Sequence, residues 1–323
     1  MNRVLARHGW SLGLLAILLI LLASTRIIQP NFGASGLDSL ARAALPFAFA
    51  TAGMAIVVIA GGIDLSIAST MAVAGVIAAL LMQQMGEANA ALVVLIVLLA
   101  GAAMGAINGF LIVLTRVPDI VVTLAMLFVW EGVALLILNA PGGTAAPWLR
   151  ALVVGAVTVP GLPPEATAWL PRAFVVLVAF VVIIWLPLRR SKLGLSVYAI
   201  GSDQNAAFRS GVPIGMTRVA AYAFAGLFAA LGGLSITLST GVGEPIAGPY
   251  LLASVAAVVL GGVALTGGKG GLLGPIIAVF ILRTLRLDLT LLSVDPNVTT
   301  IIEGTIMVAV VMAGGLLAMR GRY

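Results

Sequence analysis

The sequence has no cysteine, one histidine and few charged residues, and each shortage excludes a class of protein. Without cysteine there can be no disulfide and no cysteine-ligated metal. The one histidine, His8, lies in a basic N-terminal tail, which argues against a histidine-based catalytic or metal centre. Charged residues make up only 9% of the chain, against roughly 25% in a typical soluble domain. A soluble fold is therefore not expected.

Long apolar runs take the place of the missing charge. Hydrophobic residues account for 62% of the 323 residues, and the mean hydropathy is +1.21. Runs such as 65–86 and 88–115 carry no charge and exceed the roughly 20 residues that a helix needs to cross a bilayer. They lack the apolar–polar alternation of membrane-barrel strands. We expect one all-α polytopic membrane domain over residues 1–323, with about ten transmembrane helices near 11–27, 41–60, 66–84, 90–114, 119–138, 172–188, 217–238, 250–265, 272–288 and 298–318.

The N-terminal stretch 1–24 resembles a signal peptide because two arginines precede an apolar core. It is long enough to span, and no A-x-A cleavage site follows, so we interpret it as an uncleaved first helix.

The distribution of positive charge predicts the orientation. With the N-terminus in the cytoplasm, eleven of the 17 Lys and Arg residues fall in inner segments and six in outer ones. Because cytoplasmic loops are enriched in Lys and Arg, we expect both termini and the loop 189–217 inside, with the long loop 139–171 outside. The net charge of +6 is thus explained by the membrane, and no nucleic-acid partner is expected.

The cytoplasmic loop contains a short capped helix, within the sequence RRSKLGLSVYAIGSDQNAAFRSGV. We expect Leu195–Ile200 to be extended and Ser202 to act as the N-cap, with Asp203 favouring the positive helix start. The helix would run over 203–210 and end at Gly211, a left-handed C-cap. Because so short a helix is marginal alone in water, we expect a partner protein to hold it.

The stretch AGGIDLSIAS, residues 60–69, holds the only ionisable side chain between Arg42 and Glu87. We expect Gly61 and Gly62 to form a turn, and Asp64 to cap the next helix by accepting from the amides of Ser66 or Ile67. A gating or partner-contact role, and direct ion or solute binding, remain alternatives. A similar stretch lies 200 residues later, where Gly261 and Gly262 are expected to form a second inner-face turn.

Glycines at 101, 105 and 109 share one face of the helix predicted over 90–114. Such spacing lets a neighbouring backbone approach closely, and Asn108 beside them is placed to hydrogen-bond across a helix pair. Packing within the chain is the simplest interpretation; a subunit interface or a solute path is the alternative.

No ATP site is expected in the chain. Gly268-Lys269 is reminiscent of a P-loop, but position 263 is valine and position 270 is glycine where G-x-x-x-x-G-K-[ST] requires glycine and a hydroxyl. Energy for transport must then come from a separate ATPase or from an ion gradient.

Four blocks, in order, resemble the membrane subunits of ribose- and galactose-type sugar ABC importers. The blocks are Gly61-Gly-Ile-Asp-Leu-Ser66, Gly105-Ala-Ile-Asn-Gly109 with Arg116-Val-Pro118 and Thr123-Leu124, Tyr198-Ala-Ile-Gly201 with Ala206-Ala207 and Ser210-Gly-Val212, and Ala256-Ala-Val-Val-Leu-Gly-Gly262 with Gly267-Gly-Lys-Gly270. They extend from the second predicted helix to the ninth. The chain departs from the family pattern at Asp119, at Glu131 and at Tyr250–Ser254, which weakens the transfer of substrate identity.

The resemblance implies a permease subunit that moves a monosaccharide across the bacterial inner membrane. It implies an ABC ATPase that supplies ATP and magnesium, an extracytoplasmic solute-binding protein, a second permease copy or a homologous permease, and no cofactor in this chain. The residues expected to contact the ATPase are Ser202, Asp203, Gln204, Asn205, Ala206, Ala207, Phe208, Arg209 and Gly211. Those expected at gating turns are Gly61, Gly62, Asp64, Ser66, Gly261 and Gly262, and those expected in the path or in helix packing are Gly105, Asn108 and Thr123.

Two other functions remain open. A branched-chain amino-acid importer would use the same machinery, because its permeases share related motifs. An ion-coupled secondary transporter would need ionisable groups within the membrane, for which Glu131 and Glu303 are the candidates. An intramembrane enzyme is least favoured because no nucleophile–base pair is evident.

Overall fold

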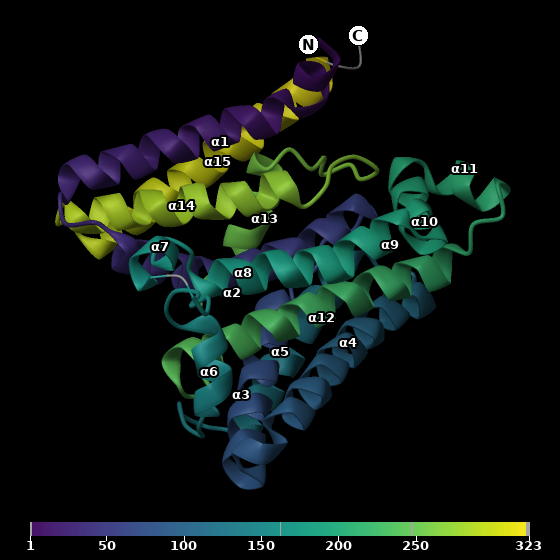
Figure 1. Ribbon diagram of the computed structural model, residues 1–323. Coiled ribbons are helices and arrows are strands. Elements are labelled where there is room, and N and C mark those ends of the chain that lie inside the picture. Colours follow the sequence, from purple (N-terminus) through teal and green to yellow (C-terminus); the bar gives the residue numbers. More distant parts are fainter. Residues whose placement is uncertain (1, 162, 247, 321–323) are drawn as a thin grey trace.

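The computed structural model describes residues 2–161, 163–246 and 248–320 and is all-helical, apart from two isolated bridges, Gly142–Gly243 and Ala156–Pro171 (Figure 1). The longer helices are α1 (Asn2–Ile28), α2 (Ala34–Ile59), α3 (Ile67–Met85), α4 (Ala90–Thr115), α5 (Asp119–Ile137), α12 (Ile214–Thr240), α14 (Leu273–Leu291) and α15 (Pro296–Arg320). The shorter ones are η1 (Glu87–Asn89), α6 (Pro147–Val153), α7 (Pro164–Thr167), α10 (Lys192–Ser202), α11 (Gln204–Arg209) and α13 (Tyr250–Leu260). The segments α8 (Arg172–Phe180), η2 (Val181–Trp185) and α9 (Leu186–Arg190) follow one another as one helix with a π-helical middle.

Seven helices in the described residues are long and apolar enough to cross a membrane. They are α1, α2, α3, the unit 87–115, α5, the unit 172–190 and α12. Helix α13 has only 11 residues, and α14 carries two arginines and an aspartate. The multi-pass architecture agrees with the composition, whereas the total of ten spans stays a prediction.

Helix α2 is the centre of the bundle. It is buried almost without interruption from Leu40 to Ile59, and α3, α8, α12, α13 and α14 all pack against it. An apolar helix that is buried on every side is expected only where other helices surround it completely. Helix α1 joins the bundle through α14, where Ser24 and Thr25 donate hydrogen bonds of 2.8 and 2.6 Å to the Asp288 carboxylate.

Helices α4 and α12 pack closely against each other, as the glycine spacing predicted for α4. A β-carbon on Gly105 would overlap the Tyr222 carbonyl oxygen, and one on Gly226 would overlap the Gly101 carbonyl oxygen. A β-carbon on Gly109 would lie 2.8 Å from the Val219 Cα. The glycine face therefore serves packing within the chain.

We expect Gly105→Ala to destabilise the bundle, because the added methyl meets backbone of α12 that cannot move alone. Overpacking of this kind costs about 1–3 kcal/mol. The matched control is Gly132→Ala on α5, where a β-carbon would meet nothing within 4 Å. Thermal unfolding in detergent should show a lower midpoint for the first variant and no loss for the second. Equal midpoints would mean that α4 and α12 do not pack this closely.

The two turns that the sequence predicts at the inner face share one backbone pattern. At the end of α2, the Gly62 and Gly61 amides donate to the carbonyls of Val57 and Val58, and Gly61 has φ +84°. At the end of α13, the Val263 and Gly262 amides donate to Val258 and Val259, and Gly262 has φ +83°. Both are Schellman endings, whose left-handed residue favours glycine. The left-handed glycines lie 201 positions apart, one more than the sequence comparison of 200 implied, because the helix cap is Ala60 in one and Gly261 in the other.

The start of α1 and the end of α15 lie together on one side of the molecule in Figure 1. Residues 1 and 321–323, which belong to the predicted cytoplasmic termini, lie outside the described residues. Which side faces the cytoplasm stays a prediction.

Candidate coupling and gating site

Helices α10 and α11 project from one end of the bundle (Figure 1). The expectation that 195–200 is extended was wrong, because Ser191 caps a helix over these residues by accepting from the Gly194 amide at 3.1 Å. The N-cap of α11 is Asp203 and not Ser202. Asp203 has extended backbone and accepts from the Asn205 and Ala206 amides, both at 2.9 Å, whereas the Ser202 hydroxyl donates back to the Tyr198 carbonyl.

The end of α11 is as predicted. Gly211 adopts φ +79°, and its amide and that of Val212 donate to Phe208 and Ala207 at 3.0 Å, which completes a Schellman motif. Only Ala207 within α11 is buried. The Phe208 side chain is 71% exposed, and Arg209 is exposed beside it. A rigidly capped helix thus presents an aromatic and a cationic side chain outward; the remaining exposed residues are Gln204, Asn205 and Ala206.

Glycine contacts bring α10 against the end of α2 and the loop 261–272. A β-carbon on Gly201 would overlap the Ile59 carbonyl oxygen and lie 2.6 Å from the Gly268 amide nitrogen. The Gly268 amide donates to Ile59 at 2.9 Å, and the Tyr198 hydroxyl donates to the Gly270 carbonyl at 2.8 Å. Burial raises the pKa of Tyr198, which keeps the phenol protonated as a donor. These contacts connect α10 with two loops that enter the bundle.

A chain of polar contacts leads from α11 into the bundle. Arg218 on α12 donates to the Gln204 side chain at 3.5 Å and to the Asp119 carboxylate on α5 at 3.4 Å. The other oxygen of Asp119 accepts from the Tyr222 hydroxyl at 2.9 Å. That hydroxyl also lies 3.3 Å from the Ile63 carbonyl in the α2–α3 turn. Asp119 and Arg218 are 13% and 22% exposed, so their ion pair is only partly solvated.

Asp64 accepts from the amide and the hydroxyl of Ser66, at 2.9 and 2.6 Å, so the expected bond to the Ser66 amide is present. The expected capping role was wrong, because the N-cap of α3 is Ser66 and no side chain caps that helix. Its neighbours continue into a buried network: the Asn108 amide group donates to the Ser66 hydroxyl at 2.7 Å and accepts from the Trp130 indole at 3.1 Å. Asp64 is 2% exposed, and this burial raises the pKa of its carboxyl while the bonds from Ser66 act in the opposite direction. The α2–α3 turn is thereby joined to α4 and α5.

The structure brings together several residues that lie far apart in the sequence. Thr123 joins the same turn, since its hydroxyl lies 3.3 Å from the Ile63 carbonyl and donates to the Asp119 carbonyl at 2.8 Å. We call the set Asp64, Ser66, Asn108, Asp119, Thr123, Trp130, Arg218 and Tyr222 the turn network.

Sequence reasoning did not assign Trp130, Arg218 or Tyr222 to the turn network. The departure from the family pattern at Asp119 was one signal, because a carboxylate at this position needs a cationic or hydrogen-bonding partner nearby. The spacing of four residues between Arg218 and Tyr222, which places both on one face of α12, was another.

Gly261 and Gly262 are not part of the turn network. Gly261 packs against Pro275 at the start of α14, and Gly262 against the Trp10 ring, whose indole donates to the Leu260 carbonyl at 2.9 Å. They anchor α1 and α14 to the end of α13. Of that loop, Gly267, Gly268 and Gly270 contact α10.

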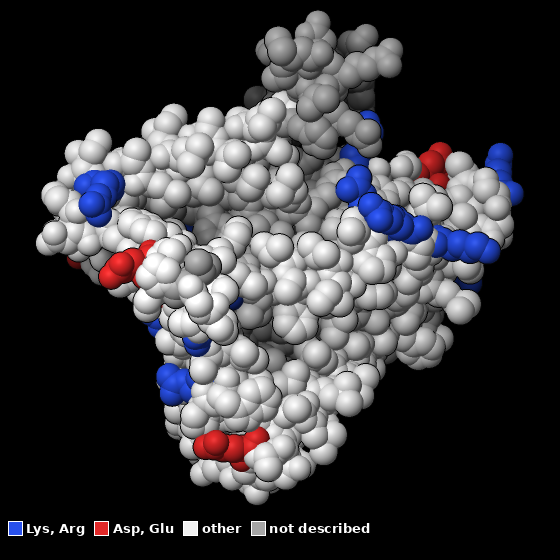
Figure 2. All heavy atoms as spheres, in the orientation of Figure 1, with Lys and Arg blue, Asp and Glu red and all other residues white. Residues whose placement is uncertain are grey.

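Positive charge surrounds α11. Figure 2 shows Lys and Arg gathered over the end of the molecule where α9, α10 and α11 lie. The exposed basic residues of this end are Arg116, Arg189, Arg190, Lys192, Arg209 and Lys269. Such a concentration is typical of the cytoplasmic side of a membrane protein.

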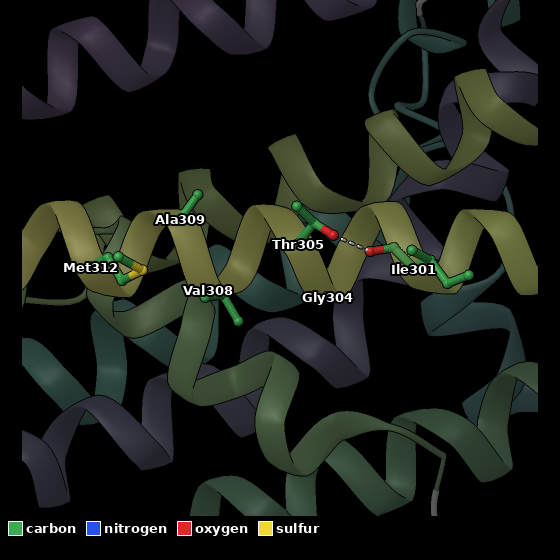
Figure 3. A pocket seen from close by; sticks show the side chains of 6 residues that line it. All are labelled: Ile301, Gly304, Thr305, Val308, Ala309 and Met312. Carbon is green, nitrogen blue, oxygen red and sulfur yellow. Dashed lines mark hydrogen bonds between the residues drawn. The ribbon is translucent and has the colours of Figure 1, made fainter.

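A shallow hollow runs along α15, lined by Ile301, Gly304, Thr305, Val308, Ala309 and Met312 (Figure 3). Its lining is apolar, and the Thr305 hydroxyl donates to the Ile301 carbonyl of its own helix at 2.8 Å. The hollow therefore offers no polar group for recognising a solute.

Comparison with known proteins identifies the family. Residues 36–311 match the family model described as branched-chain amino acid transport system / permease component. The chain belongs to this permease family. The permease is 30% identical over 322 residues to the autoinducer 2 import system permease protein LsrD of Escherichia coli O157:H7, covering 95% of this chain and 92% of that one. It is 29% identical, with the same coverage, to the LsrD proteins of E. coli K12 and Shigella flexneri. No solved structure matches the permease.

The resemblance to importer permeases is thus confirmed, and the permease is a multi-pass protein of the inner membrane. Its relatives are permease components of transport systems.

Proposed function

We propose that the permease is the membrane subunit of a binding-protein-dependent ABC importer for a monosaccharide or a similarly small, hydroxylated solute. The observation that supports this most is the capped, outward-facing α11, joined through Gln204, Arg218 and Asp119 to the α2–α3 turn. The LsrD relatives are named as permeases of autoinducer 2 import. The family description would also fit an amino-acid solute, and the four blocks that resemble sugar permeases favour the sugar.

In this mechanism the ATPase grips α11 and moves it when ATP binds or is hydrolysed. Arg218 passes the movement to α5 because its guanidinium bonds both Gln204 and Asp119. The Tyr222 hydroxyl transmits the movement to the Ile63 carbonyl, and so to the turn that connects α2 with α3. Packed elements of this kind shift between discrete arrangements rather than bending continuously.

The remaining partners follow from the same proposal. The ATPase holds ATP and magnesium, and the permease needs no cofactor of its own. The solute-binding protein docks at the opposite end of the bundle, where the loop 139–171 carries α6 and α7. A second permease copy or a homologous permease completes the pathway, and lipid covers the remaining apolar surface.

Affinity purification in mild detergent tests the proposal. A tagged permease should co-purify with a stoichiometric P-loop ATPase. Replacing residues 203–210 by a Gly/Ser linker should remove that ATPase, because the exposed Phe208 and Arg209 are lost. The matched control is the same replacement of α7 (Pro164–Thr167), which should retain it. A permease that purifies alone and transports solute down an imposed ion gradient would contradict the proposal. Glu131 would then be a candidate for ion coupling.

The other candidate for ion coupling, Glu303, is engaged elsewhere. Its carboxylate lies 3.6 Å from the Arg286 guanidinium, in an ion pair between α15 and α14. Coupling through Glu303 would require this pair to open in each cycle.

A further inference from the structure

Arg283 lies midway along α14 beside two aromatic rings that also contact each other. Its guanidinium carbon is 5.2 Å from the centre of the Phe47 ring on α2 and 5.8 Å from that of Tyr250, the first residue of α13. The two rings are themselves 6.3 Å apart. Three helices thus meet around one cation.

The cluster lies near the middle of the bilayer. The 11 residues of α13 rise about 16 Å, roughly half of the apolar thickness of about 30 Å. Arg283 is ten residues from the start of α14, or about 15 Å along it. Since Gly261, at the end of α13, packs against Pro275 near the start of α14, the two helices are level at that end, and Tyr250 and Arg283 share one depth.

An arginine at this depth is energetically unfavourable, so its presence indicates a function. Insertion of a charged side chain at the membrane centre costs free energy, and cation–π contacts offset only part of that cost. Among the described residues Arg283 forms no ion pair, because Glu303 pairs with Arg286. Its buried Nε atom has no hydrogen-bond partner there. The guanidinium therefore has hydrogen-bond donor capacity that the described residues do not use.

The non-helical segment before α13 indicates whether water and solute have access to the Arg283 guanidinium. Residues 241–246 and 248–249 descend from the end of α12 to Tyr250 without forming a helix, and Ile246, Gly248 and Pro249 are exposed. Non-helical backbone at membrane depth is tolerated only where protein buries it or where it lines a water-filled cavity. Exposure of this segment favours the cavity. Half-buried Glu244 adds a carboxylate acceptor to the same segment.

We propose that Arg283 and Tyr250 form a solute-contact site on the transport pathway, with Phe47 as the positioning residue behind the guanidinium. The site takes a small, neutral, hydroxyl-rich molecule. Arg283 donates to its oxygens, the Tyr250 ring packs on its C–H face, and Glu244 accepts from a hydroxyl. The nearby carboxylate disfavours an anion. This inference deepens the proposed function and rests on it.

The absence of cysteine makes a direct test possible, because any introduced thiol is the only one in the chain. Tyr250→Cys in the assembled transporter should react with a water-soluble methanethiosulfonate at least about tenfold faster than Ile183→Cys, since the reagent needs water and a thiolate. Ile183 is 67% exposed on the helix unit 172–190, where lipid covers it, so exposure alone does not separate the two positions. D-ribose or D-galactose should slow the modification of Tyr250→Cys.

The outcomes discriminate clearly. An unreactive Tyr250→Cys would overturn the cavity, and a reaction that neither sugar slows would overturn the solute contact. Protection by gluconate alone would overturn the preference for a neutral molecule.

Arg283→Gln should lower uptake by raising KM while the ATPase still co-purifies, and Arg283→Lys should recover part of the lost uptake. Co-purification of the ATPase through α11 tests the proposed function, whereas the cysteine reactions test the solute-contact site. Either result can fail while the other succeeds, so the two proposals are tested separately.

Discussion

Arg209→Glu should leave the permease folded and inserted but should uncouple ATP hydrolysis from uptake. Arg209 is exposed in the last turn of α11, next to Phe208, and makes no described bond that holds the bundle together. Charge reversal there changes the surface offered to the ATPase and little else. A loss of about 1.4 kcal/mol of docking free energy lowers the affinity tenfold, and we expect uptake to fall by at least that factor.

The measurement compares uptake, membrane abundance and ATPase activity in the same vesicles. Lys192→Glu is the matched control, because Lys192 is exposed at the same end of the molecule but belongs to α10. It should keep most of the uptake. Normal uptake by Arg209→Glu would remove Arg209 from the coupling contact, and Phe208→Ala would then test whether the aromatic ring carries it.

Asp119 and Arg218 should behave as a coupled pair. Asp119→Asn leaves the Arg218 guanidinium without its counter-charge and weakens the acceptor of the Tyr222 hydroxyl. Arg218→Gln leaves the Asp119 carboxylate unpaired and also releases Gln204. Removing one partner of a partly buried pair is more harmful than removing both, because an uncompensated charge remains. We expect each single variant to lower uptake strongly and the double variant to be less impaired than the sum of the two.

A double-mutant cycle checks this result. Residues in contact show interaction energies of about 0.5–3 kcal/mol, and independent sites show nearly none. Thermal unfolding in detergent should show such an interaction between Asp119 and Arg218. The control cycle pairs Arg218→Gln with Asp38→Asn, because Asp38 pairs with Arg42 instead. Strict additivity for Asp119 and Arg218 would mean that α5 and α12 are not joined through this pair.

The sequence predicted the elements that depend on local chemistry. The end of α11 was correct because Gly211 favours the left-handed conformation that closes a helix, and Pro213 lies two residues beyond it. The helices α3, α4, α5 and α12 were placed within three residues at each end because apolar length is a local property, whereas α2 begins seven residues before its predicted start at 41. The predicted extended stretch 195–200 failed because the Ser191 cap and the contacts of Gly201 with α2 make a helix of it.

The turn network was beyond sequence reasoning, because its members come from four separate stretches of the chain: the α2–α3 turn, α4, α5 and α12. Asp64 could be given only its local partner, Ser66. That Asn108 bonds Ser66 depends on how close α4 comes to the α2–α3 turn, which the packing of Gly105 and Gly109 against α12 sets. Each contact is a consequence of helix packing.

Composition, hydropathy and the four ordered blocks thus determined that this chain is a membrane permease, because burial in lipid and helix capping act over a few neighbouring residues. Only the tertiary structure decided that α11 reaches the α2–α3 turn through Arg218, Asp119 and Tyr222. It also decided that the Arg283 guanidinium lies beside the rings of Phe47 and Tyr250. Hydrogen bonds and cation–π contacts of this kind require atoms from distant segments to meet within a few ångströms, and the packing of the helices brings them there.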